Sequence, residues 1–376
     1  MSDTPDRSDP VCAGSSETAE TETAETHAAE TLAPRRRAGR GRRVAVILTA
    51  SALTLLCTVA VAGYTAIHHL MAGVRTIPNV FQGMDQSARP VMPPAARHSL
   101  TILLAGSDSR STTPTAGAGA AKMPVEQGMQ RSDLLMLVHI DADRKRVAFV
   151  SIPRDSWVPV PGYGMMKVNA ALSLGGPRLM IATVERLTHV RVDHYAVIDF
   201  HGFRSMVQAL GDVDVDVAEP TASGGVNFHR GLNKLSPTTA LAYVRQRDSL
   251  PEGDLSRIQR QQNFIRAILA KTAAEHVLTQ PLTLYRLLDA FTHALSVDST
   301  YTGAQMRSLA LQLHSLRGSD VAFLTAPVRG LGWEDQQSVV HLDSTKCAAL
   351  WSAIRHDAVA AFAKRYPATV TPAAPN

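Results

Sequence analysis

Apolar and polar positions divide the chain into five parts. Residues 1–43 are polar, residues 44–67 are apolar and uncharged, and residues 68–98 are proline-rich without regular apolar spacing. Short apolar runs then recur over residues 99–356, and residues 357–376 end in an Ala/Pro/Thr-rich segment. This pattern predicts a disordered tail, one long apolar helix, a linker, one folded domain and a C-terminal tail.

The predicted domain alternates strands with helices. Short apolar runs bounded by turn residues predict strands, and apolar residues at three- and four-residue spacing predict helices. The two runs 134–140 and 147–152 are separated by a turn and predict a β-hairpin. Such alternation is typical of a layered α-β-α domain with a mixed central sheet. The other predicted elements are strands at 100–105, 194–198, 213–217, 321–325 and 338–342, and helices at 177–188, 203–210, 237–244, 254–269, 282–295, 303–316 and 345–355.

The apolar stretch at residues 44–67 predicts a transmembrane helix. As an α-helix it would extend over about 36 Å, which is enough to cross a bilayer. A cleaved signal peptide is the alternative, but the apolar run is longer than the usual signal core. The arginines before the span predict a cytoplasmic N-terminus and an exported domain, and so no nucleic-acid partner. They are Arg35, Arg36, Arg37, Arg40, Arg42 and Arg43.

Composition excludes several classes of site. The topology predicted above places Cys12, Cys57 and Cys347 in three different compartments, so we expect neither a disulfide nor a thiolate zinc site. The chain lacks the Gly-x-Ser-x-Gly, P-loop and His-Glu-x-x-His patterns of serine hydrolases, nucleotide-driven enzymes and zinc proteases. His139 lies within an apolar run and is predicted to be a core residue. High alanine and arginine with little lysine is typical of an actinobacterial source.

Arginines concentrate around two of the predicted helices. A Ser-Pro pair predicts the start of the first helix, whose exit carries Arg245 and Arg247. Asp254 is the predicted N-cap of the second helix, on which Arg257 and Gln261 share a face. Guanidinium forks match phosphate oxygens in pairs, so this arrangement favours a phosphate site. The alternative is a solvated helix face with surface ion pairs.

Carboxylates fall at strand ends near further cations. Asp108 and Arg110 follow the strand at 100–105, Asp133 opens the next strand, and Arg154 follows the third. Carboxylates beside arginines suggest a divalent cation with a polyphosphate, because Mg²⁺ combines a few carboxylates with substrate oxygens and water. The alternatives are a plain turn around Asp108 and a structural ion-pair network.

Several motifs together resemble the LytR–CpsA–Psr family of bacterial cell-envelope proteins. Leu-Ser-Pro-x-x-Ala-Leu-Ala-Tyr-Val-Arg-Gln-Arg at 235–247 is followed by Gly-Asp-Leu-Ser-Arg-Ile-x-Arg-Gln-Gln at 253–262. Before them come Gly-Ser-Asp-x-Arg at 106–110, Arg-Ser-Asp at 131–133 and Ser-Ile-Pro-Arg-Asp at 151–155, in the order found in that family. The resemblance covers about residues 100–355, most of the exported part.

The resemblance implies a membrane-anchored phosphotransferase. Such an enzyme moves a glycopolymer from a polyprenyl-pyrophosphate carrier to a peptidoglycan hydroxyl and forms a phosphodiester. It implies Mg²⁺ or Mn²⁺ held by Asp108 and Asp133, and a lipid groove along the helices between residues 174 and 210. We expect Asp155 or another free carboxylate to act as general base. The implied catalytic residues are Asp108, Asp133, Arg154, Arg245, Arg247 and Arg257. The implied pyrophosphate-binding residues are Arg110, Arg154, Lys167, Arg245, Arg247, Arg257, Arg260 and Gln261.

Three alternatives remain open at this point. The same site could admit water and hydrolyse the lipid-linked pyrophosphate. The chain could instead be a regulator or transcriptional attenuator, although an exported domain has no access to DNA. It could also be a lipid-binding scaffold without catalysis, but the joint presence of the acidic and basic residues argues against this.

Overall fold

The computed structural model describes residues 54, 58, 63, 65, 74–107, 132–248, 250–274, 285, 289–292 and 294–375. Most of the predicted membrane span, together with Asp108 and Arg110, lies outside these residues. In the described parts, no helix has both the length and the apolar character needed to cross a membrane. The chain divides into two units after Val59, and the fold below is that of the second unit.

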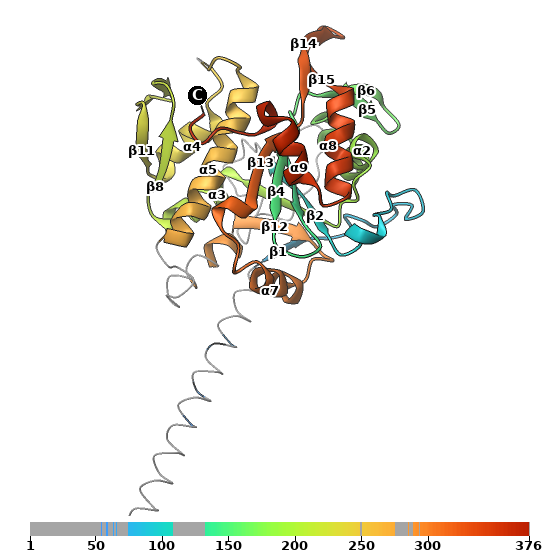
Figure 1. Cartoon of the computed structure of the whole chain (residues 1–376), viewed down its shortest axis with the longest axis horizontal. Helices are drawn as coiled ribbons and strands as arrows, with labels where there is room; N and C mark the ends of the chain where they lie inside the picture. Colours follow the sequence, from blue (N-terminus) through green and yellow to red (C-terminus); the bar gives the residue numbers. More distant parts are fainter. Residues whose placement is uncertain are drawn as a thin grey trace, which may run out of the picture. The chain divides into compact units, whose positions relative to one another are not determined.

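A mixed seven-stranded sheet forms the centre of the domain (Figure 1). Its strands, in spatial order, are β1 (Arg75–Ile77), β12 (Leu295–Asp298), β7 (His194–Asp199), β2 (Leu100–Ser107), β3 (Ser132–Ile140), β4 (Val147–Ser151) and β13 (Val321–Thr325). β2 is parallel to β7 and antiparallel to β3, while β4 is antiparallel to β3 and parallel to β13. The predicted hairpin is confirmed as β3 and β4.

Helices cover both faces of this sheet. One face packs against α2 (Ala170–Thr188), α8 (Ser344–Arg355) and α9 (Val359–Arg365) in the largest apolar core. On the other face, α7 (Gly303–Gln312) contributes Met306 and Leu309 to a smaller cluster with Ile102 and Leu104. Successive side chains of a strand point to opposite faces of the sheet, so the apolar strands give both faces apolar side chains. Both faces are therefore covered by helices, which gives the layered arrangement.

A second core lies beside the sheet. It contains α3 (Phe200–Leu210), α4 (Pro237–Arg245), α5 (Asp254–Ala274), and the strand pair β8 (Val213–Val217) and β11 (Gly231–Leu235). The predicted start of α4 is confirmed, because Ser236 caps it by accepting a hydrogen bond from the Thr239 backbone N–H, and Pro237 follows. The remaining strand pairs are β5 (Trp157–Val160) with β6 (Gly164–Lys167), β9 (Thr221–Ser223) with β10 (Val226–Phe228), and β14 (Val328–Glu334) with β15 (Gln337–Leu342).

The structure differs from the predicted linker at residues 68–98. From residue 74 onward this segment is part of the domain: β1 pairs with β12, and a 3-10 turn forms at Pro94–Ala96. The Arg89 guanidinium is buried and donates hydrogen bonds to the Glu185 carboxylate of α2. Specific polar anchors therefore hold a proline-rich segment that has no periodic apolar pattern to reveal its packing.

The predicted C-terminal tail is also packed against the domain. α9 places Phe362 in the main core, a 3-10 turn follows at Pro367–Thr369, and the Thr371 backbone N–H donates to the Phe323 carbonyl of β13. Other elements also differ from prediction. Leu295 begins a strand rather than ending a helix, and the sequence analysis did not predict β5, β6, β9, β10, β11 or β14. A 3-10 turn at Gly318–Asp320 precedes β13.

Candidate functional site

The candidate site lies at the end of the central sheet where β3 begins and β4 ends. β3 and β4 are antiparallel, and Met136 pairs with Ser151, so the beginning of β3 and the end of β4 meet there. Asp133 is the second residue of β3, and Arg154 follows β4 by three residues. The sheet therefore brings together two residues that the sequence predicted as site candidates.

Arg154 is the centre of a network of ion pairs. Its Nη1 donates to the Asp133 carboxylate, and its Nε lies 3.5 Å from Asp155 Oδ2 and 3.4 Å from Asp254 Oδ1. Arg257 Nη2 lies 2.5 Å from the same Asp254 oxygen. Lys167, at the end of β6, lies 3.3 Å from Asp155 Oδ1 and closes the other side.

The beginning of α5 brings Asp254 and Arg257 to the same end of the sheet, beside Arg154. A turn from Leu250 ends at Gly253, whose φ of 53° is in the left-handed region, and the helix starts at the next residue. Asp254 was predicted to be an N-cap, but its carboxylate makes no capping hydrogen bond and contacts the two arginines instead. Arg257 follows one helical turn later, on the same side as Asp254.

Several buried polar atoms of this network have no hydrogen-bond partner among the described residues. They are Arg154 Nε, both carboxylate oxygens of Asp254, Nε and Nη2 of Arg257, and Oε1 of Gln261. The ion-pair contacts of Asp254 with Arg154 and Arg257 bring opposite charges close without hydrogen-bond geometry. Leaving a buried polar atom without a hydrogen bond costs on the order of 1–3 kcal/mol, and more when the group is charged. Such a concentration of unused donors and acceptors is characteristic of a ligand site.

Burial and charge shift the pKa values within the network. Burial raises the pKa of Asp254, and Arg257 and Arg154 only partly oppose this effect. Burial lowers the pKa of Arg257, again against the attraction of Asp254. For Arg154, burial is outweighed by Asp254, Asp133 and Asp155, so its pKa is raised. Clusters of perturbed groups of this kind are typical of functional sites.

Arg245 and Arg247 lie at the exit of α4 and are exposed. The Arg245 guanidinium lies over the Phe200 ring, 4.4 Å from its centroid, and Phe200 begins α3 directly after β7. Arg247 is 53% exposed, and its Nε lies 3.4 Å from Asp248 Oδ1. Both are therefore outside the buried network, and each is on a flexible side chain near the α4–α5 connection.

Arg260 is separated from the network by its burial. Its side chain is fully buried, donates to Gln246 Oε1 at 2.6 Å and Thr221 Oγ1 at 2.9 Å, and stacks on the Tyr243 ring. These contacts connect α5 to α4 and β9, so we assign Arg260 a structural role instead of the expected phosphate contact. Gln261, its neighbour, donates from Nε2 to the Val244 carbonyl at 3.4 Å.

The expected metal ligands are only partly described. Asp133 and Asp254 supply carboxylates at the site, and carboxylate oxygens are ligands that suit a hard divalent cation. Among the described residues, one set of three His, Cys, Asp or Glu side chains is close enough to share an ion, and it is His139, Asp141 and Asp357. His139 is fully buried at the other end of β3, as its core prediction requires, and contacts Thr101 and Asp357 at 2.9 Å.

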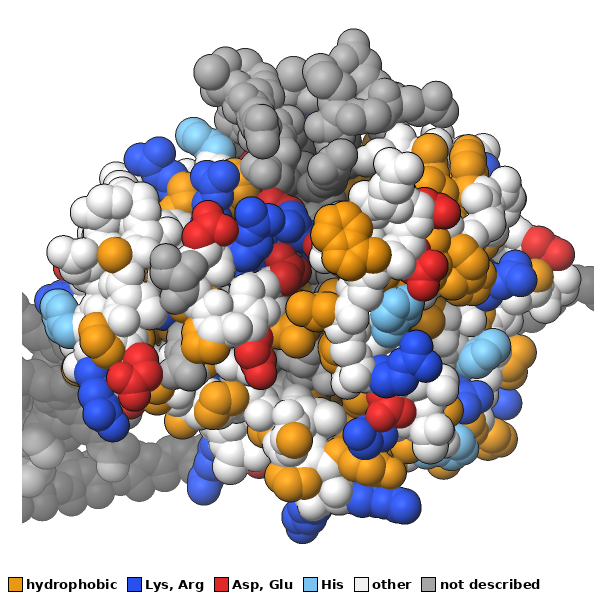
Figure 2. Space-filling view, turned by 90° about the horizontal axis from the view of Figure 1, so that it is seen from above, with side chains coloured by type: hydrophobic (Ala, Val, Ile, Leu, Met, Phe, Trp, Pro, Cys, Tyr) orange, Lys and Arg blue, Asp and Glu red, His pale blue; other side chains and the backbone are white. Residues whose placement is uncertain are grey.

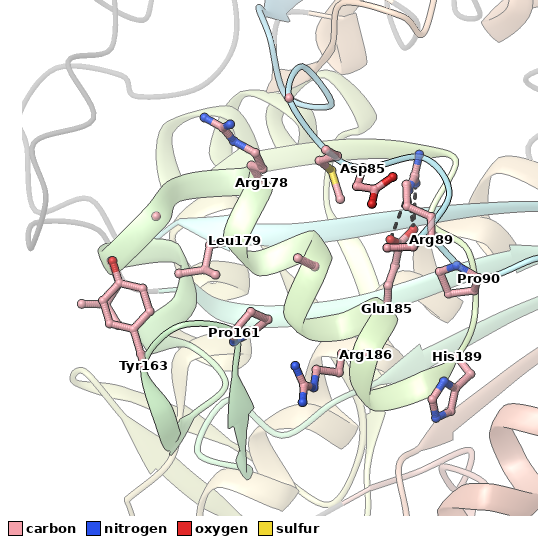
Figure 3. Close-up of a pocket in the computed structure, with 16 residues that line it drawn as sticks. Asp85, Arg89, Pro90, Pro161, Tyr163, Arg178, Leu179, Glu185, Arg186 and His189 are labelled. Carbon is pink, nitrogen blue, oxygen red and sulfur yellow. Dashed lines mark hydrogen bonds and ion pairs between the residues drawn. The ribbon is translucent and has the colours of Figure 1, made fainter.

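A cavity of about 850 Å³ follows the outer side of α2 (Figure 3). Leu174, Leu179 and Ala182 give it an apolar lining, while Arg178 and Arg186 add cations. It overlaps the first part of the stretch in which a lipid groove was expected.

The sequence analysis did not include Asp254 among the site residues, although its carboxylate lies within the ion-pair network. Asp254 belongs to the same Gly-Asp-Leu-Ser-Arg block as Arg257, one helical turn away, and this spacing was the available signal.

Seen from above (Figure 2), basic and acidic side chains lie next to one another near the middle of the face.

Comparisons with known proteins agree with this architecture. LcpA of Corynebacterium glutamicum, a cell wall biosynthesis protein, is 33% identical over 293 residues, which cover 68% of this chain and 56% of LcpA. The chain thus spans little more than half the length of that relative. LcpB of the same organism, a probable cell wall biosynthesis protein, is 32% identical over 80% of this chain and 71% of its own.

Solved structures share the fold. TagV of Bacillus subtilis superposes with a TM-score of 0.55 at 23% identity, covering 69% of this chain and 97% of that one. Protein gbs0355 of Streptococcus agalactiae gives a TM-score of 0.57 at 22% identity, covering 69% and 88%. The family model of the LytR_cpsA_psr family matches residues 75–356, from β1 to the residue after α8. The chain belongs to the LytR_cpsA_psr family.

Proposed function

We propose that the protein is a membrane-anchored phosphotransferase of cell wall assembly. It moves a glycopolymer from a polyprenyl-pyrophosphate carrier to a peptidoglycan hydroxyl and forms a phosphodiester. A relative from Oceanobacillus iheyensis, 30% identical over 54% of this chain, is named as a polyisoprenyl-teichoic acid–peptidoglycan teichoic acid transferase. The observation that carries the proposal is the buried network with unused hydrogen-bonding atoms on Arg154, Asp254, Arg257 and Gln261.

Arginine donors of the network would bind the diphosphate. Arg154 Nε, Arg257 Nε and Arg257 Nη2 make no hydrogen bond among the described residues, and the ion pairs to Asp133 and Asp254 hold both guanidinium groups in place. Donors fixed in a buried site stabilise charge on transferring oxygens without reorganisation. Arg245 and Arg247 would approach from the mouth of the site, with Arg110 and Lys167 as further phosphate contacts. Phosphoryl transfer depends mainly on such positioning and neutralisation.

Asp133 and Asp108 would hold Mg²⁺ or Mn²⁺, and Asp254, whose carboxylate oxygens make no hydrogen bond, is a third candidate. When bound, the cation neutralises charge on the diphosphate and its leaving group. Asp155 is our candidate for accepting the proton of the acceptor hydroxyl, because its carboxylate is partly exposed between Arg154 and Lys167.

Anchoring would serve the same reaction. A helix at residues 44–67 would confine the domain to the external face of the cell membrane, where the lipid-linked donor is also confined. Sharing that surface raises the effective concentration of donor at the site. Hydrolysis by water at the same site is the second candidate reaction. The name Regulatory protein MsrR, carried by a Staphylococcus aureus relative 30% identical over 55% of this chain, keeps a regulatory role as the alternative outside catalysis.

Lipid extraction tests the proposed donor. Full-length protein purified from membranes should yield a polyprenyl phosphate or pyrophosphate by mass spectrometry. Arg257→Ala should lose it, whereas Arg204→Ala, at an exposed position on α3, should retain it. Wild-type protein without an isoprenoid would remove the proposed donor, and equal amounts in all three proteins would remove Arg257 from the site that binds it.

A further inference from the structure

The β14–β15 hairpin carries two apolar side chains that face solvent. Leu331 is 69% exposed and Trp333 is 75% exposed. They are two residues apart in β14 and therefore lie on the same face of the hairpin. Tryptophan is enriched at interaction surfaces, because its large ring combines apolar area with a polar N–H.

The other face of the hairpin holds this surface in place. Gly332 lies under His341, and a Cβ at Gly332 would stand only 2.4 Å from the imidazole Nε2. The glycine thus allows His341 to lie across the strand, where Nε2 is 3.6 Å from Glu334 Oε1. Contacts on one face fix the strand, so Leu331 and Trp333 project from the other.

The base of the hairpin is joined to the candidate site. The Val340 backbone N–H donates to the Asp155 carbonyl at 2.9 Å, and Val340 also bridges to Ser156. Val340 pairs with Leu331, and Trp333 lies two residues farther along β14. Strand geometry therefore places Trp333 about 12 Å from the Asp155 backbone. This separation is comparable to one disaccharide unit.

Polar groups accompany the exposed ring. Ser338 pairs with Trp333, and Asp335, Gln336 and Gln337 form the neighbouring turn and strand start, all of them exposed. Sugar rings combine an apolar C–H face with hydroxyl and amide edges. An exposed indole beside hydroxyl and amide groups matches both features.

The sheet topology directs the hairpin away from the chain entry. β1 and β13 are the two opposite edges of the seven-stranded sheet, and β14 follows β13 after two residues. Six strand spacings separate these edges by about 29 Å. In Figure 1, β14 and β15 lie on the far side of the domain from β1.

We propose that Leu331 and Trp333 form a stacking surface for the glycan strand of the peptidoglycan acceptor. The inference rests on the proposed transfer function and names a binding surface for its acceptor. A sugar about one disaccharide unit from the reacting hydroxyl lies on Trp333, and the strand continues past the hairpin. Trp333 is a positioning residue, since it contacts the acceptor away from the reacting atoms.

Binding and kinetics of the full-length chain test this surface. Glycan strands freed of stem peptides should bind Trp333→Ala about tenfold more weakly than wild type, with Trp333→Phe between them. Leu232→Ala removes an equally exposed leucine on β11 and should bind as wild type. In the transfer reaction, Trp333→Ala should raise the acceptor KM about tenfold while kcat and the donor KM change by less than about twofold.

Two results would overturn the surface. One is wild-type glycan affinity and acceptor KM in Trp333→Ala. The other is a Trp333→Ala defect confined to binding of anionic phospholipid vesicles. Glycan binding that depends on Trp333 in a protein without transfer activity would support the surface and refute the transfer function. Active transfer with an unchanged acceptor KM in Trp333→Ala would do the reverse.

Discussion

Arg257 and Arg260 are buried one helical turn apart on α5, and replacing each by lysine should have opposite consequences. Arg257 has two nitrogen atoms without hydrogen bonds and lies 2.5 Å from Asp254. Arg260 donates to Gln246 and Thr221 and stacks on Tyr243. Lysine keeps the charge but loses the planar fork of donors. We therefore expect Arg257→Lys to lose transfer and Arg260→Lys to lose stability.

The magnitudes follow from the contacts removed. Arg260→Lys loses two charge-assisted hydrogen bonds, each worth about 1.5–3 kcal/mol, of which the ammonium recovers part. A net loss of about 3 kcal/mol would lower Tm by roughly 6–12 °C in a domain of this size. Arg257→Lys removes donors that make no hydrogen bond within the protein and keeps a cation beside Asp254, so its unfolding free energy should change by less than about 1 kcal/mol. Its kcat should fall about 100-fold, as when one oxyanion donor is lost.

Thermal unfolding and initial-rate kinetics on the full-length chain measure both effects. Arg204→Lys, at an exposed site on α3, controls for the substitution itself and should leave Tm and kcat unchanged. The rates of Arg260→Lys are compared at a temperature where it remains folded. A large loss of Tm in Arg257→Lys with normal kcat would refute the distinction between the two arginines.

Three further predictions concern the metal, pH and topology. EDTA should abolish transfer, and Mg²⁺ or Mn²⁺ should restore it; full activity in EDTA would exclude the cation. Burial and the negative charge of Asp357 raise the pKa of Asp141 from 3.8 to about 6, although His139 opposes the shift. Ionisation of Asp141 therefore destabilises the fold progressively as the pH rises from about 3.8 to about 6, and fully above pH 6. Asp141→Asn should therefore add about 1–3 kcal/mol of stability at pH 7.5 and little at pH 4. Asp143→Asn, at a half-exposed position, should not show this pH-dependent gain. An equal gain at both pH values in Asp141→Asn would contradict the prediction. A phosphatase reporter fused after Asn376 should be active only outside the cytoplasm, and cytoplasmic activity would reverse the predicted topology.

Periodic apolar patterns predicted much of the fold. β3, β4, β8 and β13 were located because each combines a short apolar run with turn residues at its ends. α4 was located because Ser236 and Pro237 define its first turn. These signals are local, and tertiary packing reinforced them.

Contacts between distant segments were beyond the sequence pattern. The predicted linker and tail lack periodicity, yet Arg89 binds Glu185 and the Thr371 hydroxyl donates to Gln262 on α5. Spacing alone placed Arg257 and Arg260 in one cluster. Only the surroundings of each side chain, set by Asp254 for one and by Gln246 and Thr221 for the other, separate them.

The most direct test of the account is the fate of the phosphorus atoms in a lipid-linked donor. Full-length protein in detergent is incubated with a synthetic polyprenyl-pyrophosphate oligosaccharide, Mg²⁺ and soluble glycan strands, and the products are followed by phosphorus NMR. The account predicts a phosphodiester on the glycan strand and one equivalent of polyprenyl phosphate, both absent with Arg154→Ala. Free oligosaccharide phosphate beside an unmodified glycan would contradict transfer and identify hydrolysis.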